Sequence, residues 1–222
     1  MPAIYLNENM DELILLWANG HYTDALDTFM TIFTHRFAWI PLYIAISYAV
    51  VKTLGWQRGL VYILAVAAAI VCADQLCGSV IRPAVGRLRP TNPDNPLSEM
   101  IHIVNGYRGG RYGMPSCHAA NTAAFLTIIT LRFRHRWLTA ILAIWMLGQC
   151  YSRMYLGVHY PSDLLVGATL GTLCSVAVFF AYRIICQRIF SEKPERVCMQ
   201  SVSVPLFIIL LSLTVMTAVS LW

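Results

Sequence analysis

Residues 59–81 read GLVYILAVAAAIVCADQLCGSVI, and this run decides the fold class. A helix needs about 20 mostly apolar residues to cross the hydrocarbon core of a bilayer. The run reaches that length with a single charged residue, Asp74. It therefore predicts a membrane-spanning helix that carries one acidic group within the span.

Further apolar runs lie on both sides of this one. They cover residues 37–51, 118–131, 137–152, 163–182 and 203–222. Several are shorter than about 20 residues, but flanking Trp, Tyr and Arg side chains can extend a helix into the membrane interface. Together the runs predict an all-α fold, in which one polytopic membrane helical bundle over residues 1–222 contains about six transmembrane helices.

The composition supports a membrane protein. Of the 222 residues, 58% are apolar and 12% are charged, and the mean hydropathy is +0.60. A soluble domain carries about 25% charged residues, so these values exclude a soluble or a disordered chain. The net charge is +5, but the basic residues do not form a compact block, which excludes a nucleic-acid partner. The seven cysteines lack CxxC spacing, which favours packing roles over a zinc site or a disulfide framework.

The N-terminal segment, residues 1–36, differs from the apolar runs. Residues 1–12 (MPAIYLNENMDE) are acidic and lack the basic start and the apolar core of a signal peptide. Residues 13–35 mix apolar and polar positions and include Asp24 and Asp27. Amphipathic helices at the membrane interface and ordinary solvated helices both fit this pattern, and the interfacial arrangement is the prediction carried forward.

The basic residues form two groups when alternate loops are assigned to opposite sides of the membrane. Nine lie near residues 52–58, 132–136 and 183–196, and seven lie in the other loops. This margin alone is too small to orient the chain. If several of the seven serve chemistry, however, the remaining bias places the group of nine in the cytoplasm.

The side with seven basic residues also carries the reactive groups. A long polar segment ends at His118, and a short one, YSRMYLGVHYPSD, covers residues 151–163. Both open on the same membrane face, and together they hold six arginines, three histidines and Asp163. Because unpaired charge beside a bilayer is costly and usually functional, residues 82–163 form the candidate catalytic region.

Arg82 and Arg89 are seven residues apart, which would align them on one helical face, although Pro83, Gly86 and Pro90 argue against a regular helix there. Guanidinium groups that converge without matching carboxylates indicate an anionic ligand. Their planar donors suit a tetrahedral oxyanion such as phosphate. Contacts with anionic lipid headgroups are the alternative for any single arginine.

The tetrapeptide Pro115-Ser116-Cys117-His118 directly precedes an apolar helix. Ser116 is a candidate N-cap, and the free amides and positive dipole end of a helix N-terminus form a ready anion site. His118 then lies in the first turn, beside any phosphate bound there. Capping alone and phosphate binding are both open for Ser116, and the two roles are compatible.

The segment from Ser152 to Asp163 contains a histidine and a carboxylate four residues apart, His159 and Asp163. Pro161 is placed to start a helix, so the carboxylate can reach back to one imidazole nitrogen and fix its tautomer. The other nitrogen is then available as a nucleophile or base. A purely structural His–Asp pair is the alternative for this spacing taken alone.

These parts together favour a metal-free phosphate-ester hydrolase without a cofactor. One imidazole attacks phosphorus, arginines and helix amides stabilise the charge, and the second imidazole protonates the leaving group. The sequence contains no HExxH motif or carboxylate cluster, and the nearby arginines would repel a divalent ion, so no metal site is predicted.

The motifs resemble those of the type 2 phosphatidic acid phosphatase family, whose pattern is K-x6-RP, then PSGH, then SR-x5-H-x3-D. The blocks here are Arg82-PAVGRL-Arg89-Pro90, Pro115-Ser116-Cys117-His118 and Ser152-Arg153-MYLGV-His159-YPS-Asp163. They occur in the family's order. The resemblance implies that His159 is the nucleophile, Asp163 its orienting partner and His118 the general acid. It also assigns phosphate binding to Arg82, Arg89, Ser116 and Arg153.

Two positions depart from the family pattern. Arg82 replaces the lysine, which preserves charge but changes reach, and Cys117 replaces the glycine of the second block. A backbone amide contact of Cys117 with phosphate is still expected, with a more crowded pocket. Outside the motifs, Arg108 and Arg111 lie on the glycine-rich segment GYRGGRYG and are predicted to contact a headgroup or to form a lid. Asp74 is predicted to pair with an arginine or with a polar group such as Gln75 or Asn121.

The resemblance implies a membrane phosphatase that hydrolyses a lipid phosphate or diphosphate, of the lipid A, undecaprenyl diphosphate or phosphatidylglycerol phosphate type. It further implies a bacterial inner-membrane protein whose site faces the periplasm. A vanadium-dependent haloperoxidase shares this type of pocket but is soluble. A lipid phosphotransferase with the same site, and a non-enzymatic protein that binds or transports anionic lipids, remain the alternatives.

Overall fold

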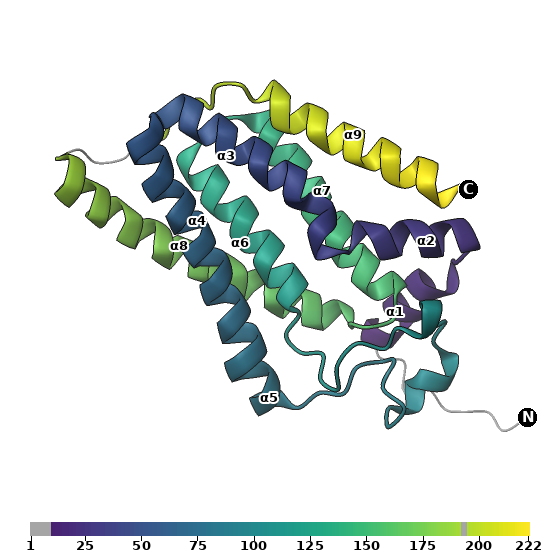
Figure 1. Cartoon of the computed structure of the whole chain (residues 1–222). Helices are drawn as coiled ribbons and strands as arrows, with labels where there is room; N and C mark the ends of the chain where they lie inside the picture. Colours follow the sequence, from purple (N-terminus) through teal and green to yellow (C-terminus); the bar gives the residue numbers. More distant parts are fainter. Residues whose placement is uncertain (1–9, 192–194) are drawn as a thin grey trace, which may run out of the picture.

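Each of the six apolar runs forms a helix in the computed structural model, which describes residues 10–191 and 195–222 (Figure 1). The helices are α1 (Met10–Gly20), α2 (Asp24–Phe33), α3 (Ile40–Leu54), α4 (Trp56–Gln75), α5 (Arg82–Val85), α6 (Cys117–Arg132), α7 (Arg136–Tyr155), α8 (Pro161–Phe190) and α9 (Ser203–Ser220). A π-helical turn, Leu76–Ile81, joins α4 to α5, and a 3-10 helix, Arg36–Trp39, precedes α3. The predicted all-α fold is therefore confirmed.

Four helical segments are long and apolar enough to cross a membrane: Arg36–Leu54, Trp56–Val85, Pro161–Phe190 and Ser203–Ser220. The other two predicted spans, α6 and α7, are helices of 16 and 20 residues. Helix α6 packs against α4, α7 and α8, and much of its apolar surface is covered by protein. At 16 residues, α6 is shorter than the roughly 20 residues that a helix needs to cross the hydrocarbon core.

Two glycines of α8 set its close approach to α6. A Cβ atom at Gly167 would lie 2.3 Å from the carbonyl oxygen of Ser116, and one at Gly171 would lie 2.0 Å from that of Ala120. Small residues at such crossings allow helix backbones to approach within a membrane. The contact brings the start of α6 to the start of α8, where the amide of Ser116 donates to the carbonyl oxygen of Asp163 at 2.9 Å.

The N-terminal segment forms two helices, α1 and α2, which both pack against α7; α2 also packs against α9. Asn19 Nδ2 donates to the carbonyl oxygens of His102 and Tyr155 at 3.0 and 2.7 Å, and the Tyr155 hydroxyl donates to Asp27 at 2.5 Å. The two helices are thus joined to the loops of the catalytic region. Their position at a membrane interface stays a prediction, and residues 1–9 lie outside the described part of the chain.

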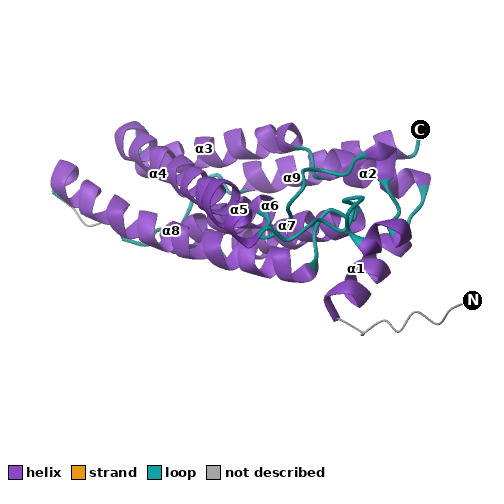
Figure 2. Cartoon of the chain, turned by 90° about the horizontal axis from the view of Figure 1, so that it is seen from below, coloured by secondary structure: helices purple, strands orange, loops and turns teal. Residues whose placement is uncertain are grey.

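The polar loops gather at one end of the bundle, as the sequence predicts. The long loop after α5 and the short loop between α7 and α8 lie together beside α1 (Figure 2). The turns between α3 and α4 and between α6 and α7 lie at the other end (Figure 1). This arrangement allows motifs that are far apart in the sequence to form one site.

Candidate active site

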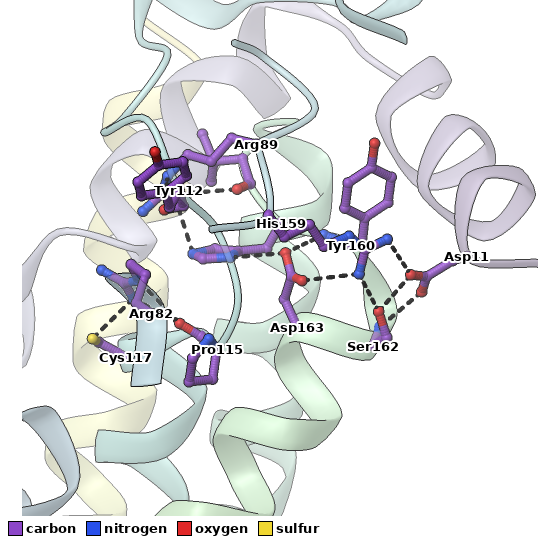
Figure 3. Close-up of polar contacts among 12 residues, drawn as sticks. Asp11, Arg82, Arg89, Tyr112, Pro115, Cys117, His159, Tyr160, Ser162 and Asp163 are labelled. Carbon is purple, nitrogen blue, oxygen red and sulfur yellow. Dashed lines mark hydrogen bonds and ion pairs between the residues drawn. The ribbon is translucent and has the colours of Figure 1, made fainter. Parts of the chain in front are cut away.

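The three motifs converge at the loop end of the bundle (Figure 3). Arg82 comes from α5 and Arg89 from the loop that follows it, and Ser116, Cys117 and His118 come from the start of α6. The last turn of α7 contributes Arg153, the next loop His159, and the first turn of α8 Asp163. The predicted catalytic and phosphate-binding residues are therefore brought together.

Asp163 orients His159 as the four-residue spacing predicts. Its Oδ2 atom lies 3.4 Å from His159 Nδ1 and accepts a hydrogen bond from the backbone amide of Tyr160 at 3.0 Å. Pro161 begins α8, and the Asp163 side chain at the third helical position caps the helix through that amide. The cap holds the carboxylate against the imidazole.

The other imidazole nitrogen faces Arg89. His159 Nε2 lies 3.2 Å from Arg89 Nη1, which also donates to the carbonyl oxygen of Val158 at 3.2 Å. A guanidinium group can only donate, so Nε2 is the unprotonated nitrogen and Nδ1 carries its proton toward Asp163. Nucleophilic attack from Nε2 requires this tautomer.

His159 is 1% exposed and is held in its neutral form. Burial, together with the positive charges of Arg89, Arg153 and Arg82, lowers the pKa of His159 well below its ordinary value. Burial also lowers the pKa of Arg89, to about 10, which leaves this guanidinium charged at neutral pH. A neutral imidazole therefore stands among cations that can hold a phosphate group.

Arg82 and Arg89 reach the site from separate elements and do not share a helical face. Helix α5 ends at Val85, and Gly86 follows in the left-handed conformation with φ at 63°. From α5, Arg82 donates to the carbonyl oxygen of Pro115 through Nε and Nη2, at 3.2 and 2.7 Å, and its Nη2 lies 2.9 Å from Cys117 Sγ. The cysteine at the family's glycine position is thus in direct contact with Arg82.

Ser116 occupies the N-cap position of α6, as predicted, although its side chain forms no capping hydrogen bond. The hydroxyl is buried without a hydrogen-bond partner among the described residues. Arg153 Nε is in the same situation, while its Nη1 and Nη2 donate to Thr34 and to the Tyr107 hydroxyl at 2.9 and 3.2 Å. Buried polar atoms are nearly always hydrogen-bonded, so these two atoms are exceptions within the described chain.

His118 lines a cavity of about 710 Å³, and His159 is not among the lining residues. Cys117 and Arg153 also line it, together with residues of α2, α3, α4, α7 and the loop at 104–107. Asp74 and Asn121 also line this cavity, and Asn121 Nδ2 donates to Asp74 Oδ1 at 2.9 Å. This hydrogen bond confirms the predicted pairing of Asp74 with Asn121.

An acidic residue of the first helix supports the site, and the sequence analysis did not identify it. Asp11 accepts hydrogen bonds from the backbone amide of Ser162, at 2.8 Å, and from its hydroxyl (Figure 3). Its Oδ2 atom also pairs with Arg87 Nη2 at 2.7 Å. Burial raises the pKa of Asp11, but the hydrogen bonds from Ser162 and Arg87 outweigh it and lower the pKa overall.

Arg87 connects Asp11 to Asp163. Its Nη1 atom lies 3.1 Å from Asp163 Oδ1, and its guanidinium carbon lies 3.8 Å from the centre of the Tyr160 ring. Asp163 therefore has His159 at one oxygen and Arg87 at the other. Neither Asp11 nor Arg87 belongs to a motif. The only signal for them in the sequence is their charge, which does not show that they pair with each other.

The glycine-rich segment packs against Asp163 and Arg89. A Cβ atom at Gly113 would lie 2.9 Å from Asp163 Oδ2, and one at Gly109, where φ is +69°, would lie 3.1 Å from Arg89 Nη1. Arg108 on this loop donates to the carbonyl oxygen of Thr91 at 2.6 Å, and the exposed Arg111 lies 3.6 Å from Asp94. Both arginines lie outside the phosphate-binding cluster, and their contact with a headgroup stays a prediction.

Over residues 10–191 and 195–222, no three His, Cys, Asp or Glu side chains gather to hold a metal ion. The charged groups of the site are arginines opposed by Asp163 and Asp11. Such a site can bind an oxyanion directly through guanidinium donors. The site can hold a phosphate between the imidazoles of His159 and His118, and the Asp163 carboxylate orients the first of them.

The sequence and the fold are similar to those of known proteins. A family model described as the PAP2 superfamily matches residues 58–185. The chain is 41% identical to the lipid A 4'-phosphatase of Bacteroides thetaiotaomicron over 186 residues, which cover 84% of this chain and 83% of that protein. It is 28% identical to the lipid A 4'-phosphatase of Porphyromonas gingivalis, over 76% of this chain and 71% of the relative.

Solved structures show the same fold. The crystal structure of Aquifex aeolicus LpxE matches with a TM-score of 0.58 at 21% identity, over 78% of this chain and 97% of that one. A transmembrane PAP2 type phosphatidylglycerolphosphate phosphatase from Bacillus subtilis matches with a TM-score of 0.53 at 24% identity, over 81% of this chain and 86% of the other.

Proposed function

This chain belongs to the PAP2 superfamily, and on that premise we propose that it is a lipid phosphatase that works through a phosphohistidine intermediate at the periplasmic face of the inner membrane. The observation that carries the proposal is the buried chain of contacts from Asp163 through His159 to Arg89. It presents an unprotonated imidazole nitrogen to the place where arginines hold phosphate. If His159 and Asp163 served only the structure, neither an unprotonated Nε2 atom nor the Arg89 guanidinium beside it would be needed.

A phosphorylated lipid of the lipid A type is the substrate we propose. A relative that is 41% identical to this chain over 186 residues, which cover 83% of its own length, is a lipid A 4'-phosphatase. The same residues would serve undecaprenyl diphosphate or phosphatidylglycerol phosphate, the substrates named for more distant relatives. The preference among these lipids depends on the groups that surround the phosphate cluster.

The reaction follows from the positions of the two imidazoles. His159 Nε2 attacks phosphorus, and an N–P bond forms as the P–O bond to the leaving alcohol breaks. His118 donates its proton to the leaving oxygen, Asp163 stabilises the positively charged imidazole, and the arginines hold the phosphate oxygens. A phosphate oxygen takes the place of His159 Nε2 as the partner of Arg89 when substrate binds. Water then attacks phosphorus and passes a proton to His118, the N–P bond to His159 breaks, and inorganic phosphate is released.

The purified enzyme is expected to release phosphate at an unchanged rate in EDTA and to be inhibited by vanadate. No step of the reaction uses a metal ion, and vanadate forms the five-coordinate geometry of the transition state, which the arginines bind more tightly than the substrate. The measurement is phosphate release from lipid A, undecaprenyl diphosphate, phosphatidylglycerol phosphate and phosphatidic acid in detergent micelles. A strict requirement for a divalent ion would refute the mechanism.

The orientation can be tested by cysteine labelling in spheroplasts. A membrane-impermeant maleimide is expected to label Asn105→Cys, on the long loop of the site, and to miss Arg134→Cys, at the other end of the bundle; both positions are exposed. Both variants are made in a background where the exposed Cys72 and Cys198 are serine. Lysed cells, in which both sites should react, serve as the control. The reverse pattern would invert the proposed topology.

A further inference from the structure

A row of ionisable side chains joins the first helix to His159. Asp11 Oδ2 lies 2.7 Å from Arg87 Nη2, and Arg87 Nη1 lies 3.1 Å from Asp163 Oδ1. Asp163 Oδ2 in turn lies 3.4 Å from His159 Nδ1. Asp11 precedes residues 58–185, which the family model matches, so the family's motifs do not account for its place in the row.

Arg87 is held on several sides within this row. Its Nη1 atom also donates to the Ser162 hydroxyl at 2.5 Å, and its guanidinium carbon lies 3.8 Å from the centre of the Tyr160 ring. The Arg87 side chain is 28% exposed, and those of Asp11 and Asp163 are 14% and 0% exposed. Solvent and salt screen partly buried ion pairs much less than exposed ones, so the charges in this row act on one another.

Arg87 determines which oxygen of Asp163 faces the imidazole. The guanidinium contacts Oδ1, which leaves Oδ2 for His159 Nδ1 and for the backbone amide of Tyr160. Without a donor at Oδ1, the carboxylate would be held from one side only, and the imidazole would have a less well oriented partner. In the proposed reaction this partner keeps the proton on Nδ1, so that Nε2 is free to attack.

Asp11 balances the charge of Arg87. An imidazole that attacks phosphorus becomes positively charged, and the Asp163 carboxylate stabilises that charge. An unbalanced guanidinium at the other oxygen would compete with the imidazole for this carboxylate, because both cations draw on one negative charge. Although burial raises it, the hydrogen bonds from Ser162 and Arg87 keep the pKa of Asp11 below its ordinary value, so Asp11 is charged at neutral pH. Its charge leaves Asp163 available to His159.

Two other charged groups lie near the row, and neither takes the place of Asp11. Arg89 also exerts its charge on Asp163, but it contacts the opposite side of the imidazole, at His159 Nε2. Glu12 follows Asp11 on α1 and exerts its charge on Tyr160, but it forms no ion pair within the described part of the chain. Asp11 is therefore the acidic group that pairs with Arg87.

We propose that Asp11 and Arg87 are positioning residues of this enzyme, which hold the Asp163 carboxylate in place and leave its charge to the imidazole of His159; the inference rests on the phosphatase activity proposed above. Both act through Asp163, at the Nδ1 side of the imidazole, and the phosphate is bound at the Nε2 side. The pair is therefore expected to change the rate of the reaction and to leave the binding of the lipid unchanged.

The test is a double-mutant cycle on phosphate release by the purified enzyme. Asp11→Asn removes the charge but keeps an oxygen that can accept from the Ser162 amide. We expect this variant to lower kcat about tenfold at unchanged KM, since a misplacement of about 1 Å in an active site can cost up to about a hundredfold in rate. Arg87→Gln should lower kcat at least as much. In the Arg87→Gln background, Asp11→Asn should lower kcat no further, because Asp11 acts through Arg87.

Glu12→Gln is the matched control. It removes one negative charge from the adjacent position of α1, where the side chain forms no ion pair with any described residue, and it should keep the wild-type kcat. If Asp11→Asn fails to fold, Arg87→Gln alone decides, because this variant retains the contact of Asp11 with Ser162. A lower kcat at unchanged KM then supports the inference, and a wild-type kcat overturns it.

A wild-type kcat in Asp11→Asn would overturn the inference and leave the proposed function standing. Equal losses from Asp11→Asn with and without Arg87 would also overturn it, because Asp11 would then act independently, as a residue that only docks α1. A loss confined to KM would do the same. A wild-type enzyme that releases phosphate from none of the four lipids named above would overturn the proposed function and this inference together.

Discussion

Replacing His159 with alanine is expected to reduce phosphate release by on the order of a thousandfold or more, because the variant has no nucleophile to form the covalent intermediate. The imidazole is buried, oriented by Asp163 and contacted by Arg89, and no other histidine of the described chain has this set of partners. The measurement is kcat on the preferred lipid. A second readout is protein-bound radioactive phosphate after incubation with labelled lipid, which should be stable in alkali, labile in acid and lost in the variant.

His21→Ala is the matched control for this experiment. His21 is exposed, and its Nδ1 contacts the carbonyl oxygen of Trp17 at 2.6 Å, at the end of α1. The control should retain the wild-type rate and the phosphoprotein label. If His159→Ala keeps its function while the protein still binds anionic lipid, the chain is a lipid-binding or transport protein. Transfer of the label to an added lipid or sugar alcohol would instead identify a phosphotransferase.

Replacing Gly171 with alanine is expected to destabilise the protein by about 3 kcal/mol or more, because the added methyl group overlaps protein backbone. The Cβ atom would lie 2.0 Å from the carbonyl oxygen of Ala120, and a backbone atom inside a helix cannot move aside without separating α6 from α8. That separation also moves Ser116 and His118 away from Asp163. We therefore expect a lower melting temperature in detergent, and a lower kcat in the protein that still folds.

Gly20→Ala tests whether this loss is specific to the helix crossing. Gly20 ends α1, and a Cβ atom there would meet no other atom within 4 Å. The control should melt with the wild type. Equal melting temperatures for Gly171→Ala and the wild type would show that α6 and α8 do not approach each other as described.

The sequence predicts the helices and the main catalytic residues because both signals are local. Hydropathy along a run such as 59–81 reports on a spanning helix without any knowledge of its neighbours. His159 and Asp163 are one helical turn apart, so their contact follows from the chain itself. Arg82 and Arg89 were harder to place, since Gly86 ends the helix between them and directs the second arginine into a loop.

Contacts between distant segments could not be read in the same way. Asp11 reaches Ser162 and Arg87 only because α1 packs against α7 and α8, and nothing in the amino-terminal sequence specifies that docking. The hydroxyl of Ser116 lies at a helix start, where capping is the usual role, yet it forms no capping hydrogen bond. The cavity beside His118 likewise depends on how α4, α6 and α7 pack.

The link between Asp11 and Ser162 also sets an order of events during synthesis. The two residues are 151 positions apart in the chain, so the carboxylate is made long before its partner. At about 5–20 residues per second, a ribosome needs roughly 8–30 s to cover that distance. The contacts of α1 with Ser162 therefore form only after α8 begins to emerge. A chain that stops before Ser162 leaves Asp11 without this partner, so the complete site belongs only to a protein whose translation has passed that residue.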